Sequence, residues 1–295
     1  MFTVTFLGTS GSVPSVDRGM PSIALRYGNH LMLWDCGEGT QRQLMKYKVG
    51  YGSINSIFIT HPHPDHYLGL VGLLETLKIS SIYNKKIDLY LPSSLYESFS
   101  EIASRFEFVS LHKIKSGSLL KTKDFTVRAF RVKHCKDAFG FVFEESERLK
   151  FHENKAHSLG LKGEMFRQIQ KTGQIKTENG VVKLSEISWK NPGRKVVYSG
   201  DCLPSESTIK EANCANLLIH EATFDQSKSA EAKERMHSTA YGAATLAAKA
   251  SVKSLILTHI SPRYSGDSLS ILIDEAKLAF SSSAIALDGL SIEVK

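Results

Sequence analysis

The chain has 295 residues, of which 42% are hydrophobic and 23% are charged, proportions of a globular protein rather than a disordered or fibrous one. Its formal net charge of +7 favours a polyanionic partner, although a scattered basic surface is the alternative. The N-terminus lacks the basic start and long apolar run of a secretion signal, and no window reaches the length of a membrane span. We therefore expect a cytoplasmic protein that has no membrane partner.

Apolar and alternating segments predict the regular elements of the first half of the chain. The first of these segments ends in a glycine-rich turn at residues 8–11, and Gly28-Asn29 reads as a hairpin turn. The expected strands are Phe2–Leu7, Ser22–Tyr27, His30–Trp34, Ile54–Ile59, Ile87–Leu91 and Phe125–Val132, and the expected helices are Leu68–Leu77 and Leu95–Arg105.

The stretch 150–195 is rich in lysine and poor in large aliphatic residues. Beyond it, the pattern predicts strands at Val196–Ser199, Leu217–Ile219 and Leu255–Leu257 and a helix at Ala240–Ala250. Runs of strands broken by helices favour two sheets packed face to face with helices outside. The sequence thus predicts a single domain over 1–295 of α/β class, a four-layer αββα sandwich, with 150–195 as an inserted flexible arm.

The densest chemical signal is the segment Thr60-His61-Pro62-His63-Pro64-Asp65-His66. Side chains at i and i+2 of an extended chain point to the same side, so His61 and His63 can share one ion. The prolines that follow them favour the extended conformation. Asp65 and His66 fall where the next helix begins, and all four are ligand types that suit zinc. A polar loop with incidental histidines is the alternative.

Three more ligand types directly follow apolar strands, at His134, Asp201 and His259. Sheet proteins collect their functional residues at strand ends. A lone histidine there is more often structural, but three such positions beside the first motif favour a metal site.

Together these residues resemble the metallo-β-lactamase superfamily, through the HxHxDH motif followed by a later His, Asp and His. The segments FLGTSGSVP, LWDCGEGTQRQL, VVYSGDC, LIHEATF and THISPRY are similar to the tRNA 3′-processing endoribonuclease family, RNase Z, in its short form. The resemblance covers nearly the whole chain. It implies a metallo-β-lactamase fold whose arm protrudes to grip tRNA, and a homodimer.

The resemblance also implies roles for individual residues. One zinc ion would be held by His61, His63 and His134, and a second by Asp65, His66 and His259, with Asp201 bridging them. Asp35 would orient a histidine ligand. Glu221 and His237 match a pair that supplies general-acid catalysis, and with Asp65 they complete the expected catalytic set; a helix cap and an ordinary surface histidine are the alternative for the pair.

The implied activity is removal of the 3′ trailer from precursor tRNA by zinc-dependent hydrolysis, leaving a 3′-hydroxyl on the tRNA. Another phosphodiesterase or hydrolase acting on a small molecule is the alternative, against which the basic insertion argues. Expected RNA contacts are Pro14 and Arg18 in an N-terminal loop and Lys162, Arg167 and Lys171 in the arm.

Two segments depart from the family pattern. The loop that helps the family reject tRNA already carrying CCA usually reads Pro-x-Lys-x-Arg-Asn, whereas here Val16 and Gly19 replace the lysine and the asparagine. The usual Gly-Pro at the tip of the arm is Gly163-Glu164. Rejection of CCA-bearing tRNA is therefore the property that this sequence puts in doubt.

Overall fold

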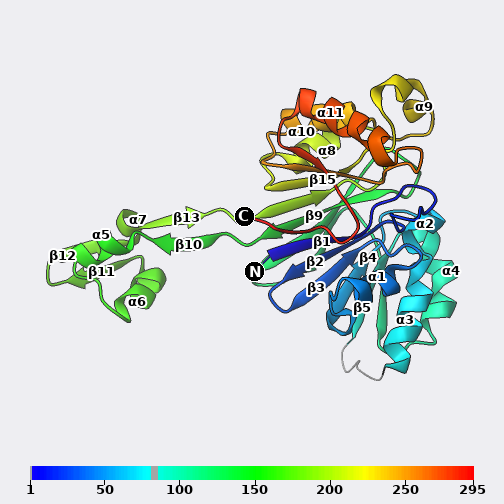
Figure 1. The fold of residues 1–295 in the computed structure, drawn as a ribbon. Helices are drawn as coiled ribbons and strands as arrows, with labels where there is room; N and C mark the ends of the chain where they lie inside the picture. The colour runs from blue at the N-terminus through cyan, green and yellow to red at the C-terminus, as the bar shows by residue number, and fades with distance from the viewer. Residues whose placement is uncertain (1, 81–85) are drawn as a thin grey trace. The chain divides into compact units, whose positions relative to one another are not determined.

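A computed structural model describes residues 2–80 and 86–295 (Figure 1). The described residues form two compact units. The first unit comprises the described residues up to Thr122 together with Thr126–Phe143 and Arg194–Lys295, and the second unit comprises Lys123–Phe125 and Glu144–Gly193. No helix in the described part of the chain is long and apolar enough to cross a membrane.

The first unit contains two seven-stranded sheets. In the first sheet the order is β18-β1-β2-β3-β4-β5-β6, in which β1 to β3 are antiparallel and β3 to β6 are parallel. Its strands are β1 (Phe2–Gly8), β2 (Ser22–Tyr27), β3 (His30–Trp34), β4 (Ile54–Phe58), β5 (Ile87–Leu91), β6 (Val109–Lys113) and β18 (Ser291–Glu293).

The second sheet has the order β17-β16-β15-β14-β9-β8-β7, and its strands β14 to β17 are parallel. The carboxyl ends of these parallel strands therefore meet at one edge of the sheet. The strands are β7 (Gly117–Lys121), β8 (Phe125–Arg131), β9 (Phe139–Glu145), β14 (Lys195–Tyr198), β15 (Leu217–Glu221), β16 (Leu255–Thr258) and β17 (Ser283–Ile285).

Aromatic side chains from the two sheets meet between them. Trp34 of β3 stacks on Tyr198 of β14 with 5.9 Å between ring centroids, and Phe58 of β4 lies 5.7 Å from Phe141 of β9. All four side chains are buried. Burial of such large apolar rings contributes much of the hydrophobic stabilisation that joins the two sheets.

Helices cover the outer faces, on opposite sides of the sandwich in Figure 1. Leucines of α3 pack with the first sheet, and alanines of α10 pack with the second, in two separate buried clusters. The predicted αββα sandwich is therefore confirmed. The helices of the first layer are α1 (Thr40–Lys46), α3 (Gly69–Ile79) and α4 (Ser93–Ala103), and those of the other are α8 (Glu206–Ala212), α10 (Ala240–Lys249) and α11 (Leu269–Ala279).

The second unit has a small core of its own. The sequence pattern of this stretch predicts no helix or strand, because its aliphatic residues are few and widely spaced. In the structure, six of them converge: Ala156, Leu161, Ile169, Ile175, Val182 and Ile187. Around them lie the antiparallel pairs β10 (Arg148–Phe151) with β13 (Ser188–Asn191) and β11 (Gln174–Thr177) with β12 (Gly180–Lys183), and the helices α5 (Glu153–Ser158), α6 (Met165–Thr172) and α7 (Leu184–Ile187).

Candidate metal centre

The loop after β4 carries the first histidines of the centre. A short helix, α2 (Pro64–Tyr67), begins at Pro64, which occupies the first helical position, where a missing N–H costs nothing. His63 before it is extended, with φ −73° and ψ 138°, as expected for a residue that precedes proline. Asp65 lies in the first turn of α2. Pro64 thus separates an extended pair of histidines from a helical aspartate and histidine.

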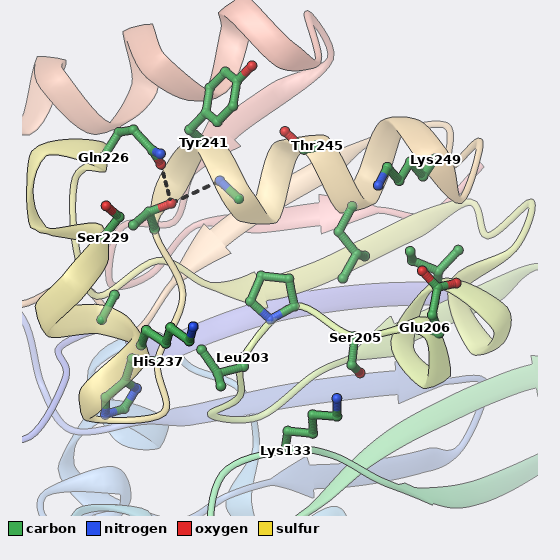
Figure 2. A pocket seen from close by; sticks show the side chains of 17 residues that line it. Lys133, Leu203, Ser205, Glu206, Gln226, Ser229, His237, Tyr241, Thr245 and Lys249 are labelled. Atoms are coloured by element: carbon green, nitrogen blue, oxygen red, sulfur yellow. Dashed lines mark hydrogen bonds between the residues drawn. The ribbon is translucent and has the colours of Figure 1, made fainter.

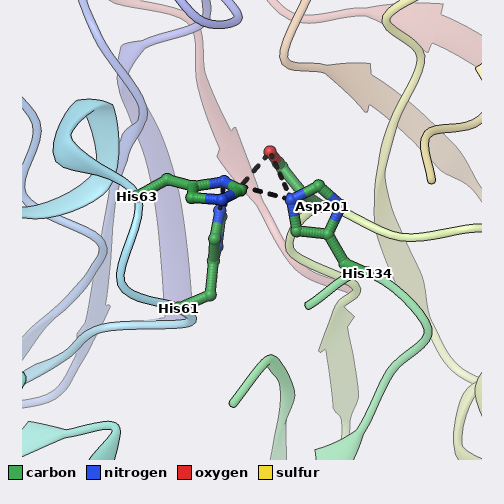
Figure 3. Close-up of side chains that lie close together, drawn as sticks. All are labelled: His61, His63, His134 and Asp201. Atoms are coloured by element: carbon green, nitrogen blue, oxygen red, sulfur yellow. Dashed lines mark hydrogen bonds and ion pairs between the residues drawn. The ribbon is translucent and has the colours of Figure 1, made fainter. Parts of the chain in front are cut away.

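Four side chains form the first donor group (Figure 3). His61 Nε2 lies 2.9 Å from His63 Nδ1, and His134 Nε2 lies 3.1 Å from the same atom. Asp201, which follows β14, places Oδ2 3.7 Å from His61 Nε2 and 3.9 Å from His134 Nε2. These four residues meet the spacing of a group that could hold one metal ion.

A second donor group consists of Asp65, His66 and His259. Asp65 Oδ2 lies 3.6 Å from His66 Nε2 and 3.5 Å from His259 Nε2. Asp201 Oδ2 lies close to this group too, 3.4 Å from His66 Nε2 and 3.2 Å from His259 Nε2. One oxygen of Asp201 therefore stands between the two groups, and all seven ligands expected from the sequence come together.

Two observations test whether these residues fit metal ions. Ligand atoms bound tetrahedrally at the usual zinc–nitrogen distances lie roughly 3.3–3.4 Å apart, which is close to the separations found here. In addition, His66 Nε2, His259 Nε2 and Asp201 Oδ1 are buried without a hydrogen-bond partner among the described residues. Buried polar atoms are normally satisfied. The donor set therefore fits metal ions.

The nitrogens that face away from the centre are held by other groups. His134 Nδ1 donates to the carbonyl oxygen of Met236 at 2.9 Å, and His259 Nδ1 lies 2.9 Å from the hydroxyl of Thr223. His66 Nδ1 lies 2.8 Å from a carboxylate oxygen of Asp35. Such contacts fix the tautomer of a metal-binding imidazole and orient its ring.

Asp35 follows β3 and is fully buried, with a positive φ of 60°. It accepts hydrogen bonds from the backbone N–H of Thr60 at 2.8 Å and from the hydroxyl of Tyr198 at 2.9 Å. This buried carboxylate thus connects the loop after β4 to the second sheet.

Several side chains at the centre have pKa values shifted from their ordinary values. Burial holds the pKa of His61 well below its usual value, which keeps a lone pair available on the ring. Burial opposes ionisation of Asp201, but the charges of His259 and His66 outweigh it and hold its pKa well below the ordinary value. Burial also raises the pKa of Asp65, but the hydrogen bond from His259 outweighs this together with the neighbouring histidine charges, and the pKa is lowered to about 2. Both carboxylates are therefore available as anionic ligands.

The glycine-rich turn after β1 supports the ring of His259. Gly11 donates its N–H to the carbonyl of Ile260 at 2.9 Å, so the turn lies directly against the end of β16. A Cβ atom at Gly11 would lie 2.7 Å from His259 Nδ1. His259 itself has a positive φ of 56°, a costly conformation for a residue other than glycine. The close approach at Gly11 requires a residue without a side chain.

Glu221 and His237 form a pair beside the second donor group, in which Glu221 is fully buried and the side chain of His237 is 12% exposed. His237 Nδ1 donates to Glu221 Oε1 at 2.7 Å, and its ring stacks on that of His259 with 5.4 Å between centroids. Burial lowers the pKa of His237, but the charge of Glu221 dominates and raises it to about 9. Glu221 also accepts from the backbone N–H of Cys202 and from Thr223. His237, Asp201 and His259 also each offer a ligand atom within 4.8 Å of the others.

The residues expected to contact RNA have different surroundings. Pro14 is exposed, but Arg18 is only 7% exposed, and its guanidinium donates to Thr9 Oγ1 and to the carbonyl of Ala286. Arg18 thus anchors the loop to the rest of the protein through these two hydrogen bonds. In the second unit Arg167 and Lys171 are exposed one turn apart on α6, and the exposed Lys162 precedes that helix.

Sequence reasoning missed several residues that support the centre. Thr60 and Thr223 each link a carboxylate to a histidine, and the hydroxyl of Tyr264 donates to Asp225 at 2.7 Å beyond β15. Their only signal was a position next to a candidate ligand or within a family motif.

Known proteins similar to this chain point to one family over its full length. A ribonuclease Z of Archaeoglobus fulgidus is 40% identical, with 100% of this chain and 98% of the relative covered, and one of Methanosarcina acetivorans is 36% identical over the same shares. The crystal structure of the short form of human tRNase Z is similar with a TM-score of 0.71 and 31% identity, covering 99% of both chains. A metallo-β-lactamase fold protein of Bacillus subtilis, 20% identical with a TM-score of 0.72, shares the fold over 99% of this chain and 98% of its own.

A family model also matches part of the chain. Residues 2–169 match the model described as Anti-Pycsar protein Apyc1. This match includes His61 to His134 but ends before Asp201, Glu221, His237 and His259. The chain therefore belongs to the ribonuclease Z family of metallo-β-lactamase-fold proteins over its whole length, and its residues 2–169 belong to the Apyc1 family as well.

Proposed function

We propose that this chain is a metal-dependent endoribonuclease that removes the 3′ trailer from precursor tRNA. The similarity to ribonuclease Z over the whole chain supports this activity. The observation that carries the chemistry is the position of Asp201 Oδ2, within 4 Å of imidazole nitrogens from both donor groups.

We propose zinc as the cofactor, with two ions per chain. The first would be held by His61, His63 and His134 and the second by Asp65, His66 and His259, with Asp201 shared. Nitrogen and carboxylate donors of this kind suit zinc. Two such ions, when bound, stabilise charge on phosphoryl oxygens and lower the pKa of a bound water.

The chain's own residues would position and protonate the reacting groups. Asp65 would be held as an anionic ligand by the N–H of Ser12, 3.1 Å from Oδ2. His237, protonated at neutral pH, would donate the proton on Nε2 to the 3′-oxygen of the nucleotide that stays on the tRNA. Glu221 would fix the tautomer and stabilise the charge of the imidazolium ring.

The second unit would bind the folded part of the tRNA. The stretch 150–195 has ten lysines and arginines and four glutamates, a net charge of 10 − 4 = +6, whereas the whole second unit, which also contains Asp124 and three glutamates before residue 150 and ends before Arg194, has ten basic and eight acidic residues, 10 − 8 = +2. Exposed cations such as Lys162, Arg167 and Lys171 suit phosphate contacts that position RNA without reading its bases. We further propose a homodimer in the cytoplasm, which the family resemblance implies.

A second candidate is a phosphodiesterase or another hydrolase that acts on a small molecule, which a two-metal donor set of this kind would equally serve. The two candidates differ in substrate size. Incubation of the purified protein with a precursor tRNA and with a small aryl phosphodiester separates them. Trailer removal at rates far above those on the small ester would support the first candidate, and hydrolysis of the small ester alone would reject it.

A further inference from the structure

A pocket beside His237 has no role in the chemistry described so far. It has a volume of about 550 Å³ and lies between α10, α9 (Ser229–Glu234) and the segment that leads into α8 (Figure 2). This volume falls within the range of small-ligand sites. In Figure 2 His237 lies at the left of the pocket and Lys249 at the right.

The pocket combines an apolar wall with a cationic edge. Its apolar lining includes Leu203, Pro204 and Leu246, and the pocket is also lined by Tyr241, which is 41% exposed. The charged residues that line it are three exposed lysines, Lys133, Lys233 and Lys249, and one glutamate, Glu206. An aromatic and apolar surface for a base, edged by cations for phosphates, is how proteins bind single-stranded nucleic acid.

Backbone contacts join this pocket directly to the metal centre. Lys133 and Leu203 form an isolated β-bridge, in which Leu203 N donates to Lys133 O at 2.8 Å. The next residue after Lys133 is His134, and Asp201 lies two residues before Leu203. A base in the pocket would therefore be attached to a phosphate within reach of the centre.

The chemistry of the general acid decides which nucleotide this is. Here we rely on the proposed function, in which His237 protonates the 3′-oxygen that leaves phosphorus. That oxygen belongs to the nucleotide on the 5′ side of the cleaved bond, which becomes the last nucleotide of the cleaved tRNA. We propose that the pocket beside His237 binds the base of this nucleotide, with Tyr241 contacting the base and Lys249 neutralising a neighbouring phosphate.

The test uses three precursor tRNAs: one intact, one with an abasic residue at the last nucleotide of the tRNA, and one with an abasic residue at the first nucleotide of the trailer. Single-turnover cleavage is measured for the wild type and Tyr241→Ala. The abasic residue on the 5′ side should slow the wild type roughly 5- to 150-fold, the range for loss of one stacked base. Because Tyr241→Ala has already lost that contact, the same abasic residue should slow this variant much less.

Lys249→Ala provides a second variant on the surface of α10, with Lys277→Ala on α11 as the control that removes the same charge outside the pocket. Weaker binding of intact precursor by Lys249→Ala than by Lys277→Ala is the expected result. The proposal is overturned if the 5′-side abasic residue slows the wild type and Tyr241→Ala equally. It is also overturned if only the abasic residue in the trailer slows Tyr241→Ala less than it slows the wild type. If the wild type cleaves no precursor at all, the proposed function fails and this inference fails with it.

Discussion

His237 Nδ1 and Glu221 Oε1 are 2.7 Å apart at the edge of the metal centre, and Glu221 is fully buried. The carboxylate has further hydrogen bonds from Cys202 and Thr223, so its position does not depend on the histidine. A carboxylate fixed in this way presents an imidazolium ring to the substrate as a proton donor.

Replacement of His237 by alanine should therefore slow precursor cleavage roughly 10²–10⁴-fold, the usual contribution of a positioned acid. The loss should be much smaller on a nitrophenyl phosphodiester, because nitrophenolate leaves without a proton. Metal content should stay unchanged, which excludes a collapsed centre. Equal losses on both substrates would contradict a general acid and would favour His237 as a ligand.

Asp201→Ala should remove more metal than His134→Ala does. Asp201 Oδ2 contacts both donor groups, whereas His134 belongs to one of them. Metal measured per chain after purification in zinc should fall from near two to well below that number in the Asp201 variant. Full occupancy in Asp201→Ala would show that no shared ligand exists there.

Gly11→Ala tests the support of His259 without changing any proposed ligand. The added Cβ would stand 2.7 Å from Nδ1 and 2.9 Å from the carbonyl oxygen of His259, so the ring or the turn must move. We expect zinc affinity to fall roughly 10–100-fold, as when a contact that orients a ligand is lost. His259→Ala serves as the comparison. Unchanged zinc affinity with full activity would mean that the turn moves to accept the Cβ and that it does not hold His259 in place.

The altered N-terminal loop should weaken rejection of tRNA that already carries CCA, or move the cleavage position beyond CCA. Val16 is fully exposed, and Gly19 offers no side-chain amide. Mapping of product 3′ ends from precursors with and without encoded CCA measures this. If the protein does not cleave tRNA that already carries CCA, residues other than Val16 and Gly19 must reject the CCA end. Arg42 and Lys46, which line the same hollow as Pro14 and Val16, are then the residues to replace.

The sequence predicted most of the sandwich because its strands and helices carry strong apolar patterns. The predicted Ser22–Tyr27 and Ile87–Leu91 have the same bounds in the structure, and the helix predicted at Leu95–Arg105 runs from Ser93 to Ala103. The sequence does not predict strand β9, although FGFVF is strongly apolar, because glycine has a low strand propensity. The sequence predicts the ligands His134, Asp201 and His259 because each directly follows an apolar strand. That one oxygen of Asp201 faces both donor groups depends on the three-dimensional structure and cannot be predicted from the sequence.

Local sequence could not predict the second unit or the anchoring role of Arg18. Buried residues such as Ile169 and Ile187 are separated by many polar residues, so their small core depends on contacts made only in the folded state. Arg18 looked like an RNA contact from its family motif, yet it is buried against Thr9 and Ala286. Pattern alone does not distinguish a buried arginine from an exposed one.

Cations of the second unit should contribute to affinity for precursor tRNA in a salt-dependent way. If about four phosphates are neutralised there, log affinity against log salt should fall with a slope near −0.9 per contact, using the duplex-DNA value. Alanine at Lys162, Arg167 and Lys171 together should weaken binding and flatten that slope. A triple alanine variant at the exposed Lys115, Lys121 and Lys277 loses the same charge, and it should change the affinity and the salt slope less. Equal effects of the two triples would indicate general charge attraction only.

The most direct test of the account is to map the ends produced from a precursor tRNA by the purified protein, before and after removal of metal by a chelator. We predict one cut that leaves a 3′-hydroxyl on the tRNA, loss of this cut after chelation, and its return when zinc is added. An intact precursor alongside metal-dependent hydrolysis of a small phosphodiester would contradict the central claim that this metal centre processes tRNA.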